Sequence, residues 1–159
     1  FAFPDMYEIG MSYLGMQILY KAVNDMDGLY CERVFAPGED MKKIMKTEGI
    51  PLFTLETKTP VKKTDMLGFT LQYEMSYTTV LDMLDLAGIP LLSSHRGEDD
   101  PVIAAGGPCA FNPEPLADFI DIFLIGDGED LLPAVLDLHA LCREKGKTKK
   151  ESTEKEMEL

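Results

Sequence analysis

The sequence predicts an α/β protein whose doubly wound, mainly parallel sheet of five strands is covered by helices on both faces, giving three layers. Two observations lead to this prediction. Short apolar runs alternate with longer segments in which apolar residues recur at helical spacing, and glycine or proline marks many of the junctions. Apolar residues make up 45% of the 159 residues, which is enough for the core of one domain of ordinary size.

Five apolar runs are expected to form the sheet. They lie at residues 1–3, 29–35, 66–71, 101–105 and 120–125. Short runs without regular polar alternation are typical of strands buried on both faces of a parallel sheet. Residues 51–55 are expected to add a short extra strand. Because helical segments separate the strands, a flavodoxin-like strand order is expected.

The helices are predicted from the spacing of apolar residues between these runs. They are expected at residues 11–24, 39–47, 77–86, 113–118 and 129–143. In the first, Met11, Leu14 and Ile18 share one face. The second begins with acidic residues and continues with lysines, which matches the helix dipole. Gly49 and Gly88 are placed to end the second and third helices, since glycine readily adopts the left-handed conformation at a helix C-terminus.

The two ends of the chain differ in character. Residues 145–159 are rich in lysine and glutamate and poor in apolar side chains. We therefore expect a polar tail beyond an α/β domain at 1–144, either a frayed extension of the last helix or a linker. The chain opens on Phe1, inside an apolar run and without an initiator methionine, and we expect it to be a trimmed segment of a longer protein.

Charge and cysteine content exclude several function classes. The 28 acidic and 15 basic side chains give a formal net charge of −13, which disfavours binding to nucleic acid or to an anionic membrane. We see no signal-peptide pattern and no membrane-spanning run, so a cytoplasmic protein is expected. Cys31, Cys109 and Cys142 are far apart in the sequence, and we expect reduced thiols rather than metal ligands.

Candidate site residues follow the predicted strands. Ligands of open parallel sheets bind beyond the carboxyl ends of the strands, near the point where the strand order reverses. Glycine at these ends permits positive φ and close approach of the backbone to a ligand. The cofactor-binding candidates, in chain order, are Asp5, Tyr7, Gly10, Thr70, Gly106, Gly107, Gly126 and Gly128. His95 and His139 are expected on the surface, and no catalytic residue or metal ligand is predicted.

Familiar nucleotide and phosphate sites do not match these strand ends. No G-x-G-x-x-G opens a helix after the first strand, and no Walker lysine is present. A receiver domain would need an aspartate after the third strand, where residues 70–73 provide none. The acidic residues between Asp5 and Glu8 oppose the phosphate of a flavin. A stand-alone flavodoxin-like binding protein is therefore the least favoured alternative.

Several stretches resemble one family. Residues 106–118, Gly-Gly-Pro-Cys-Ala-Phe-Asn-Pro-Glu-Pro-Leu-Ala-Asp, and the strand that ends in Gly126-Asp-Gly-Glu129 resemble the second half of the cobalamin-binding domain of class B radical SAM enzymes. Residues 3–12, 32–37 and 71–77 are similar to the N-terminal module of a bacterial radical SAM subfamily. The resemblance extends over roughly residues 1–140.

The resemblance implies a five-stranded sheet with cobalamin, if it binds, at the carboxyl ends of the strands. The family's D-x-H-x-x-G pattern is replaced here by Asp5-Met-Tyr-Glu-Ile-Gly10, with Tyr7 in place of the axial histidine. A neutral phenol is a poor cobalt ligand. Thr70 resembles the small hydroxyl residue that the family places after its middle strand.

Two readings of the resemblance stay open. The favoured one is a degenerate domain that serves substrate recognition or docking on the radical SAM barrel of the same polypeptide, with Tyr7, Tyr73 and Phe111 filling the cobalamin space. The alternative is a functional cobalamin-binding module without a protein axial ligand. The cysteine motif C-x-x-x-C-x-x-C does not occur in this sequence, so the resemblance assigns the 4Fe–4S cluster and S-adenosylmethionine to a domain downstream.

Overall fold

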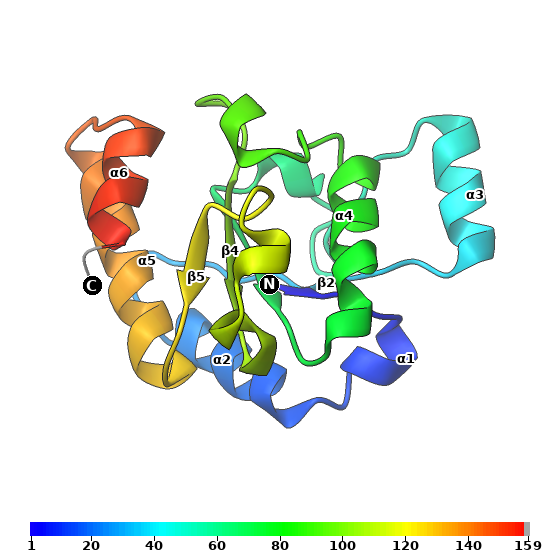
Figure 1. Ribbon diagram of the computed structural model, residues 1–159, viewed down its shortest axis with the longest axis horizontal. Helices are drawn as coiled ribbons and strands as arrows, with labels where there is room; N and C mark the ends of the chain where they lie inside the picture. The colour runs from blue at the N-terminus through cyan, green and yellow to red at the C-terminus, as the bar shows by residue number, and fades with distance from the viewer. Residues whose placement is uncertain (158–159) are drawn as a thin grey trace.

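A computed structural model describes residues 1–157 of the chain and contains a five-stranded sheet (Figure 1). All of its strands run parallel, in the order β2-β1-β3-β4-β5. The strands are β1 (Ala2–Phe3), β2 (Val34–Phe35), β3 (Met66–Thr70), β4 (Val102–Gly106) and β5 (Ile122–Leu124). The predicted fold class is confirmed, including the flavodoxin-like order, in which the chain builds outward from β1 in both directions.

The helices that accompany the sheet are α1 (Tyr7–Gly10), α2 (Leu14–Asn24), α3 (Glu39–Glu48), α4 (Tyr77–Leu86), α5 (Gly128–Glu144) and α6 (Lys149–Glu156). In the main core, α4 packs through Val80 and Leu84 on a sheet face that carries Phe69 and Ile103. Side chains of the alternate register, among them Ala104, form a smaller cluster on the other face. Helices α2 and α5 contact each other, and α5 also contacts β5.

Three predicted elements differ from the structure for local reasons. Strand β2 is shorter than the predicted 29–35, because the Asn24 side chain binds both backbone groups of Cys31, at 3.0 and 3.1 Å, and holds that segment at the end of α2. Residues 51–55 contribute only one isolated bridge. Of the predicted helix at 113–118, only Glu114–Leu116 forms a short 3₁₀ turn, at which Pro113 and Pro115 lack backbone donors.

The C-terminal segment, predicted to be a polar tail that frays from the last helix or serves as a linker, forms a separate helix at residues 149–156. Helix α6 begins with a capping box, in which the Thr148 side chain accepts from the Glu151 backbone and the Glu151 carboxylate accepts from the Thr148 N–H at 3.0 Å. The T-x-x-E pattern was the sequence signal for this helix. That the segment leads into a further domain stays a prediction.

Helix α6 packs on α5 through a buried polar cluster. The Nδ1 atom of His139 lies 2.8 Å from Oε1 of Glu156, and the Ser152 hydroxyl donates to the same oxygen at 2.8 Å. All three residues are buried. The surface position predicted for His139 is therefore wrong. His139 was expected to face water from the surface of its helix, but α6 folds back over it.

A second buried charge fixes the loop between α4 and β4. The Arg96 side chain is 1% exposed, and its Nη1 lies 2.9 Å from Oδ1 of Asp121. The guanidinium also donates to the carbonyls of Pro90 and Leu91, at 3.0 and 2.7 Å. The other Asp121 oxygen accepts from the Ile103 N–H of β4, at 2.7 Å. One arginine thus joins the loop to the centre of the sheet.

We expect Arg96→Ala to lower the free energy of unfolding by about 3–5 kcal/mol, because it leaves the Asp121 carboxylate, whose side chain is 11% exposed, without its charged partner. Urea denaturation of the chain measures this change. The matched control is Arg143→Ala, which breaks an exposed pair with Asp65 and is expected to cost at most about 1 kcal/mol. Equal losses in the two variants would contradict the role of burial.

Candidate functional site

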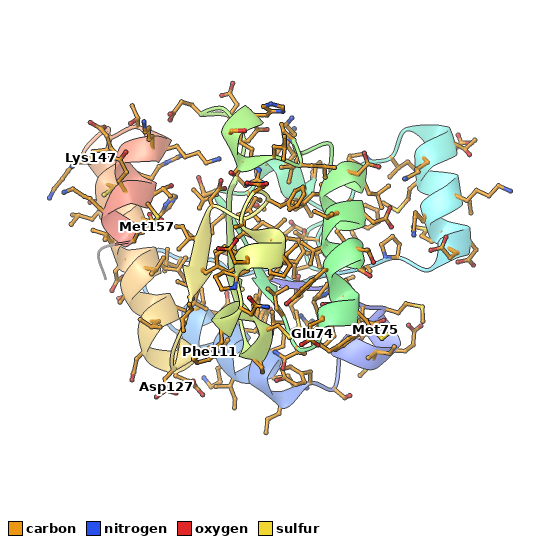
Figure 2. The ribbon with its side chains drawn as sticks, viewed as in Figure 1. Glu74, Met75, Phe111, Asp127, Lys147 and Met157 are labelled. Carbon is orange, nitrogen blue, oxygen red and sulfur yellow. The ribbon has the colours of Figure 1, made fainter. Side chains whose placement is uncertain are left out.

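The predicted site residues lie at the carboxyl edge of the sheet. Because all strands are parallel, the loops that follow them emerge at this one edge. Figure 2 shows Met75, Phe111 and Asp127, from the segments after β3, β4 and β5, at the end of the molecule that also holds α1 and the start of α2. The strand order reverses between β1 and β3, so the crevice between their loops is the expected ligand position.

Asp5 and Tyr73 join the two sides of this crevice. The Tyr73 hydroxyl, after β3, donates to Oδ2 of Asp5, after β1. The other Asp5 oxygen accepts from the Met6 N–H at 2.8 Å, and the Asp5 carbonyl accepts from the Ala36 N–H at 2.9 Å. The hydrogen bond to the Asp5 carboxylate raises the pKa of the Tyr73 phenol, and partial burial raises it further.

A second bridge runs beside the first. The Tyr13 hydroxyl, just before α2, donates to Oε1 of Gln72 at 2.5 Å. The Gln72 amide nitrogen in turn donates to the hydroxyl of Thr70, which is buried at the end of β3. The hydroxyl that the sequence offered to a cofactor is therefore already bound to a neighbouring side chain.

Tyr7 and Gly10 pack against the ends of β1 and β2. The Tyr7 ring meets the Phe35 ring edge to face, with centroids 5.3 Å apart, and the residue remains 44% exposed. A Cβ atom at Gly10 would lie 2.6 Å from the Phe35 ring and 2.7 Å from the Phe3 ring. The D-x-Y-x-x-G spacing thus supplies a bridging carboxylate, an aromatic contact and a close approach of α1 to the sheet.

The double glycine after β4 serves a close contact between two strand ends. Gly107 has a φ of +100°, and a Cβ there would lie 2.9 Å from the Leu71 carbonyl oxygen. At Gly106 the corresponding Cβ would lie 3.5 Å from the Leu124 carbonyl oxygen. At Gly107 the positive φ and the close Leu71 carbonyl explain a glycine, whereas the contact at Gly106 is of ordinary van der Waals length. That these glycines bind a cofactor stays a prediction.

The glycines after β5 have similar close neighbours. Gly126 has a φ of +146°, and a Cβ there would lie 2.9 Å from the Leu131 side chain. A Cβ at Gly128, the first residue of α5, would lie 3.3 Å from Leu19 of α2. Both glycines allow the start of α5 to pack closely against its neighbours.

Exposed apolar side chains surround the bridged crevice. Met75 is 86% and Phe111 71% exposed, and both extend from the carboxyl edge in Figure 2. Of the three bulky side chains expected to fill the crevice, Tyr73 spans it, Tyr7 packs on Phe35 and Phe111 faces solvent. We call the exposed set the carboxyl-edge rim; it comprises Tyr7, Ile9, Tyr73, Met75, Phe111 and Ile125. Sequence reasoning did not find it, because side chains from four separate segments compose it.

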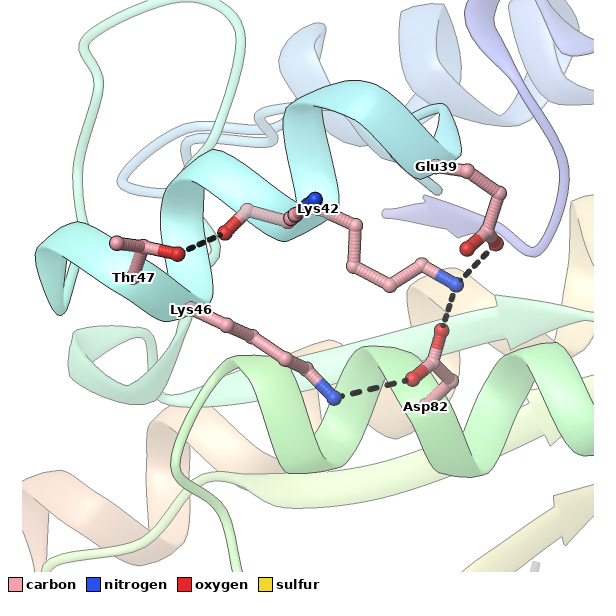
Figure 3. Close-up of a pocket in the computed structure, with 6 residues that line it drawn as sticks. Glu39, Lys42, Lys46, Thr47 and Asp82 are labelled. Carbon is pink, nitrogen blue, oxygen red and sulfur yellow. Dashed lines mark hydrogen bonds and ion pairs between the residues drawn. The ribbon is translucent and has the colours of Figure 1, made fainter.

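A hollow between α3 and α4 is formed by ion pairs (Figure 3). Lys42 lies 2.6 Å from Asp82 and 2.5 Å from Glu39, and Lys46 lies 3.2 Å from Asp85. The carboxylates raise the pKa of the Lys42 ammonium. The pairing of Lys42 and Lys46 with carboxylates of α4 holds α3 against α4.

Residues 1–157 contain neither a cluster of metal ligands nor a membrane-spanning helix. Within that range no three histidine, cysteine, aspartate or glutamate side chains lie close enough together to share a metal ion. Nor does any helix there combine the length and the hydropathy that crossing a bilayer requires.

The comparison with protein families decides the relationship of this chain. Residues 15–159 match the family model described as radical SAM proteins, N-terminal. The chain belongs to this family. The comparisons with curated proteins and with solved structures give no match.

The assignment confirms the coarser part of the sequence interpretation, an N-terminal accessory domain of radical SAM proteins. The cobalamin-binding-like subtype and the class B relationship stay predictions. The family match begins at Gly15 and leaves out the Asp5-to-Gly10 segment, on which the comparison with D-x-H-x-x-G depends.

In this N-terminal radical SAM domain we expect Gly10→Ala to lower the free energy of unfolding by about 1–3 kcal/mol, because the added methyl would overlap two buried rings. Thermal unfolding of the two proteins measures the loss. Gly97→Ala is the control, since its added methyl meets no atom within 4 Å. If both variants unfold at the same temperature, close packing is not the role of Gly10.

Proposed function

We propose that this N-terminal radical SAM domain is an accessory module that docks on the radical SAM barrel of its own polypeptide, with a degenerate cobalamin-binding fold whose ligand crevice the protein itself has closed. The observation that carries the proposal is the pair of bridges, Tyr73 to Asp5 and Tyr13 to Gln72, across the reversal of strand order. The 4Fe–4S cluster and S-adenosylmethionine belong, in this proposal, to the barrel.

The residues at the crevice do not suit cobalamin. A corrin ring placed there would have to break both bridges, and every hydroxyl, amide or carboxylate left without a partner would cost free energy. The phenol of Tyr7 packs on Phe35, at the position where the family has an imidazole. The segment around Leu71 lies against Gly107, where a flat ligand would need space. The proposed function therefore does not require cobalamin in this domain.

The carboxyl-edge rim supports docking. Large apolar side chains gathered on one face of a domain mark interaction surfaces, because their exposure to water is unfavourable. Met75 and Phe111 are the most exposed members of the rim. Glu74 precedes Met75 in the sequence, and the exposed residues Glu74 and Asp127 lie at the same end of the molecule in Figure 2. An apolar centre with a charged border is the usual composition of a protein–protein interface.

A functional cobalamin module without a protein axial ligand is the second candidate. The exposure of Tyr7 and Phe111 favours it, because both rings offer aromatic surface at the carboxyl edge on which a ligand could lie without entering the crevice. The two candidates differ in whether hydroxocobalamin binds to the domain.

We expect hydroxocobalamin at saturating concentration to leave both its visible spectrum and the melting temperature of the domain unchanged, since a bound ligand would raise that temperature. Tyr7→His, which restores D-x-H-x-x-G, serves as the matched variant. If the bridges close the crevice, it too will not bind. A spectral shift with the unaltered domain would establish the second candidate, and a shift with Tyr7→His alone would show that only the imidazole was missing.

Docking is tested by placing charge on the rim. In the full-length parent polypeptide we expect Met75→Asp with Phe111→Asp to speed amide exchange in residues 73–76 and 108–111 by about tenfold or more, because the barrel no longer covers them. Ile44→Asp, on exposed α3, is the control and should leave these amides protected. The proposal fails if these amides exchange as fast in the unaltered full-length protein as in the isolated domain.

A further inference from the structure

Helix α6 contains no apolar side chain. Its residues, Lys149–Glu156, are lysine, glutamate, serine and threonine only. A helix without an apolar face gains little hydrophobic free energy by docking, and so short a helix is unstable by itself in water. Helix α6 nevertheless lies along α5 and buries two side chains, Ser152 and Glu156 (Figure 1). The polar contacts of this interface therefore hold the helix in place.

A fully buried carboxylate lies at the centre of these contacts. The Glu156 side chain is 0% exposed, and that of His139 is 8% exposed. Oε1 of Glu156 accepts from the Ser152 hydroxyl at 2.8 Å and lies 2.8 Å from Nδ1 of His139. Oε2 is buried and has no hydrogen-bond partner within residues 1–157. Burying a carboxylate is costly unless a positive charge accompanies it or a proton neutralises it.

The charged groups near His139 on α5 are engaged elsewhere or exposed. Arg143, one turn further along the helix, pairs with Asp65 at 3.1 Å. Glu144 is exposed, and the thiol of Cys142 is buried. None of these side chains on α5 supplies a second positive charge to the cluster.

The charged groups of α6 and of the loop before β4 also leave the cluster alone. The Lys149 ammonium donates to the carbonyls of Asp100 and Pro101, at 3.1 and 2.8 Å. The remaining charged side chains of α6 and of this loop are exposed: Glu98, Asp99, Lys150, Glu151, Glu154 and Lys155. Within residues 1–157, His139 is the only basic side chain that pairs with Glu156.

We propose that α6 is a proton-dependent latch, which stays docked on α5 while the pair of His139 and Glu156 holds one proton and is released when that proton leaves. With the proton, the pair is an imidazolium beside a carboxylate or an imidazole beside a carboxylic acid. Both forms bury no net charge. Without the proton, docking would bury an uncompensated carboxylate.

The direction of the pH dependence follows from the protons bound in the docked and released states. In water, histidine is protonated below about pH 6.5 and glutamate below about pH 4.3. Above about pH 6.5 the released pair holds no proton and the docked pair holds one, so docking weakens as pH rises. Between about pH 4.3 and 6.5 both states hold one proton, and docking does not depend on pH.

Lys149 contributes a pH dependence of the opposite sign. Burial lowers the pKa of its ammonium in the docked state, so this residue favours docking as the pH rises into the alkaline range. A variant that changes Glu156 keeps this contribution and removes that of the pair, and a variant of Lys149 does the reverse.

Amide hydrogen exchange of the chain measures the latch. Between pH 6.5 and 7.5 we expect the opening constant of α6, read from the amides of residues 153–156, to rise by about fivefold, because the released histidine loses its proton over this range. The amides of residues 81–84 in α4 correct for the intrinsic effect of pH on exchange.

Glu156→Gln is the matched variant, because glutamine keeps the shape of the side chain but binds no proton. Its opening constant is expected to fall by about twofold over the same range, since only the released histidine then takes up a proton. Lys149→Met, which keeps the pair, should retain the fivefold rise even if Glu156→Gln leaves α6 unprotected.

Four results would overturn the proposal. They are an α6 that exchanges only together with α4, an opening constant of the unaltered chain that does not rise with pH, a rise that persists in Glu156→Gln, and a rise that is lost in Lys149→Met. None of these measurements involves the carboxyl edge, so the result is independent of the docking proposal.

Discussion

The parallel alignment of five short strands is the constraint on which this structure depends. Between two parallel strands the chain must return along the whole length of the sheet before the next strand can begin. The two edges of the sheet therefore carry different loops. Turns that follow strands gather at one edge, and turns that precede strands gather at the other. The bridged crevice is a consequence of this division, because it lies where β1 meets its neighbour β3.

Close contacts of the backbone, more than exposed chemistry, account for the glycines at the carboxyl edge. Gly107 lets the segment after β4 touch the carbonyl of Leu71, and Gly10 lets α1 lie on two phenylalanine rings. Glycine-rich strand ends are equally suited to holding a ligand and to holding each other. In this N-terminal radical SAM domain the atoms that lie close to Gly10 and Gly107 are the protein's own.

The sequence allowed the fold to be predicted well wherever a local signal was strong. Helix α4 has the predicted bounds, and Gly49 adopts the left-handed conformation expected at the end of α3. The two hydrogen-bonded bridges could not be predicted from the sequence. Tyr73 and Asp5, for example, are 68 residues apart, and no periodicity connects them. The burial of His139 was missed for a related reason. It depends on α6 folding back, and the polar composition of that segment hid its capping box.

Because α6 runs back along α5, it also determines how far its own end lies from the carboxyl edge of the sheet. Glu156 lies beside His139, partway down α5, and not beyond its far end (Figure 1). Measured along the helix axis at 1.5 Å per residue, His139 is only about 17 Å from Gly128 at the carboxyl edge. An extended link of roughly five residues covers that length. The end of α6 therefore lies nearer to the carboxyl edge than the length of α5 would suggest.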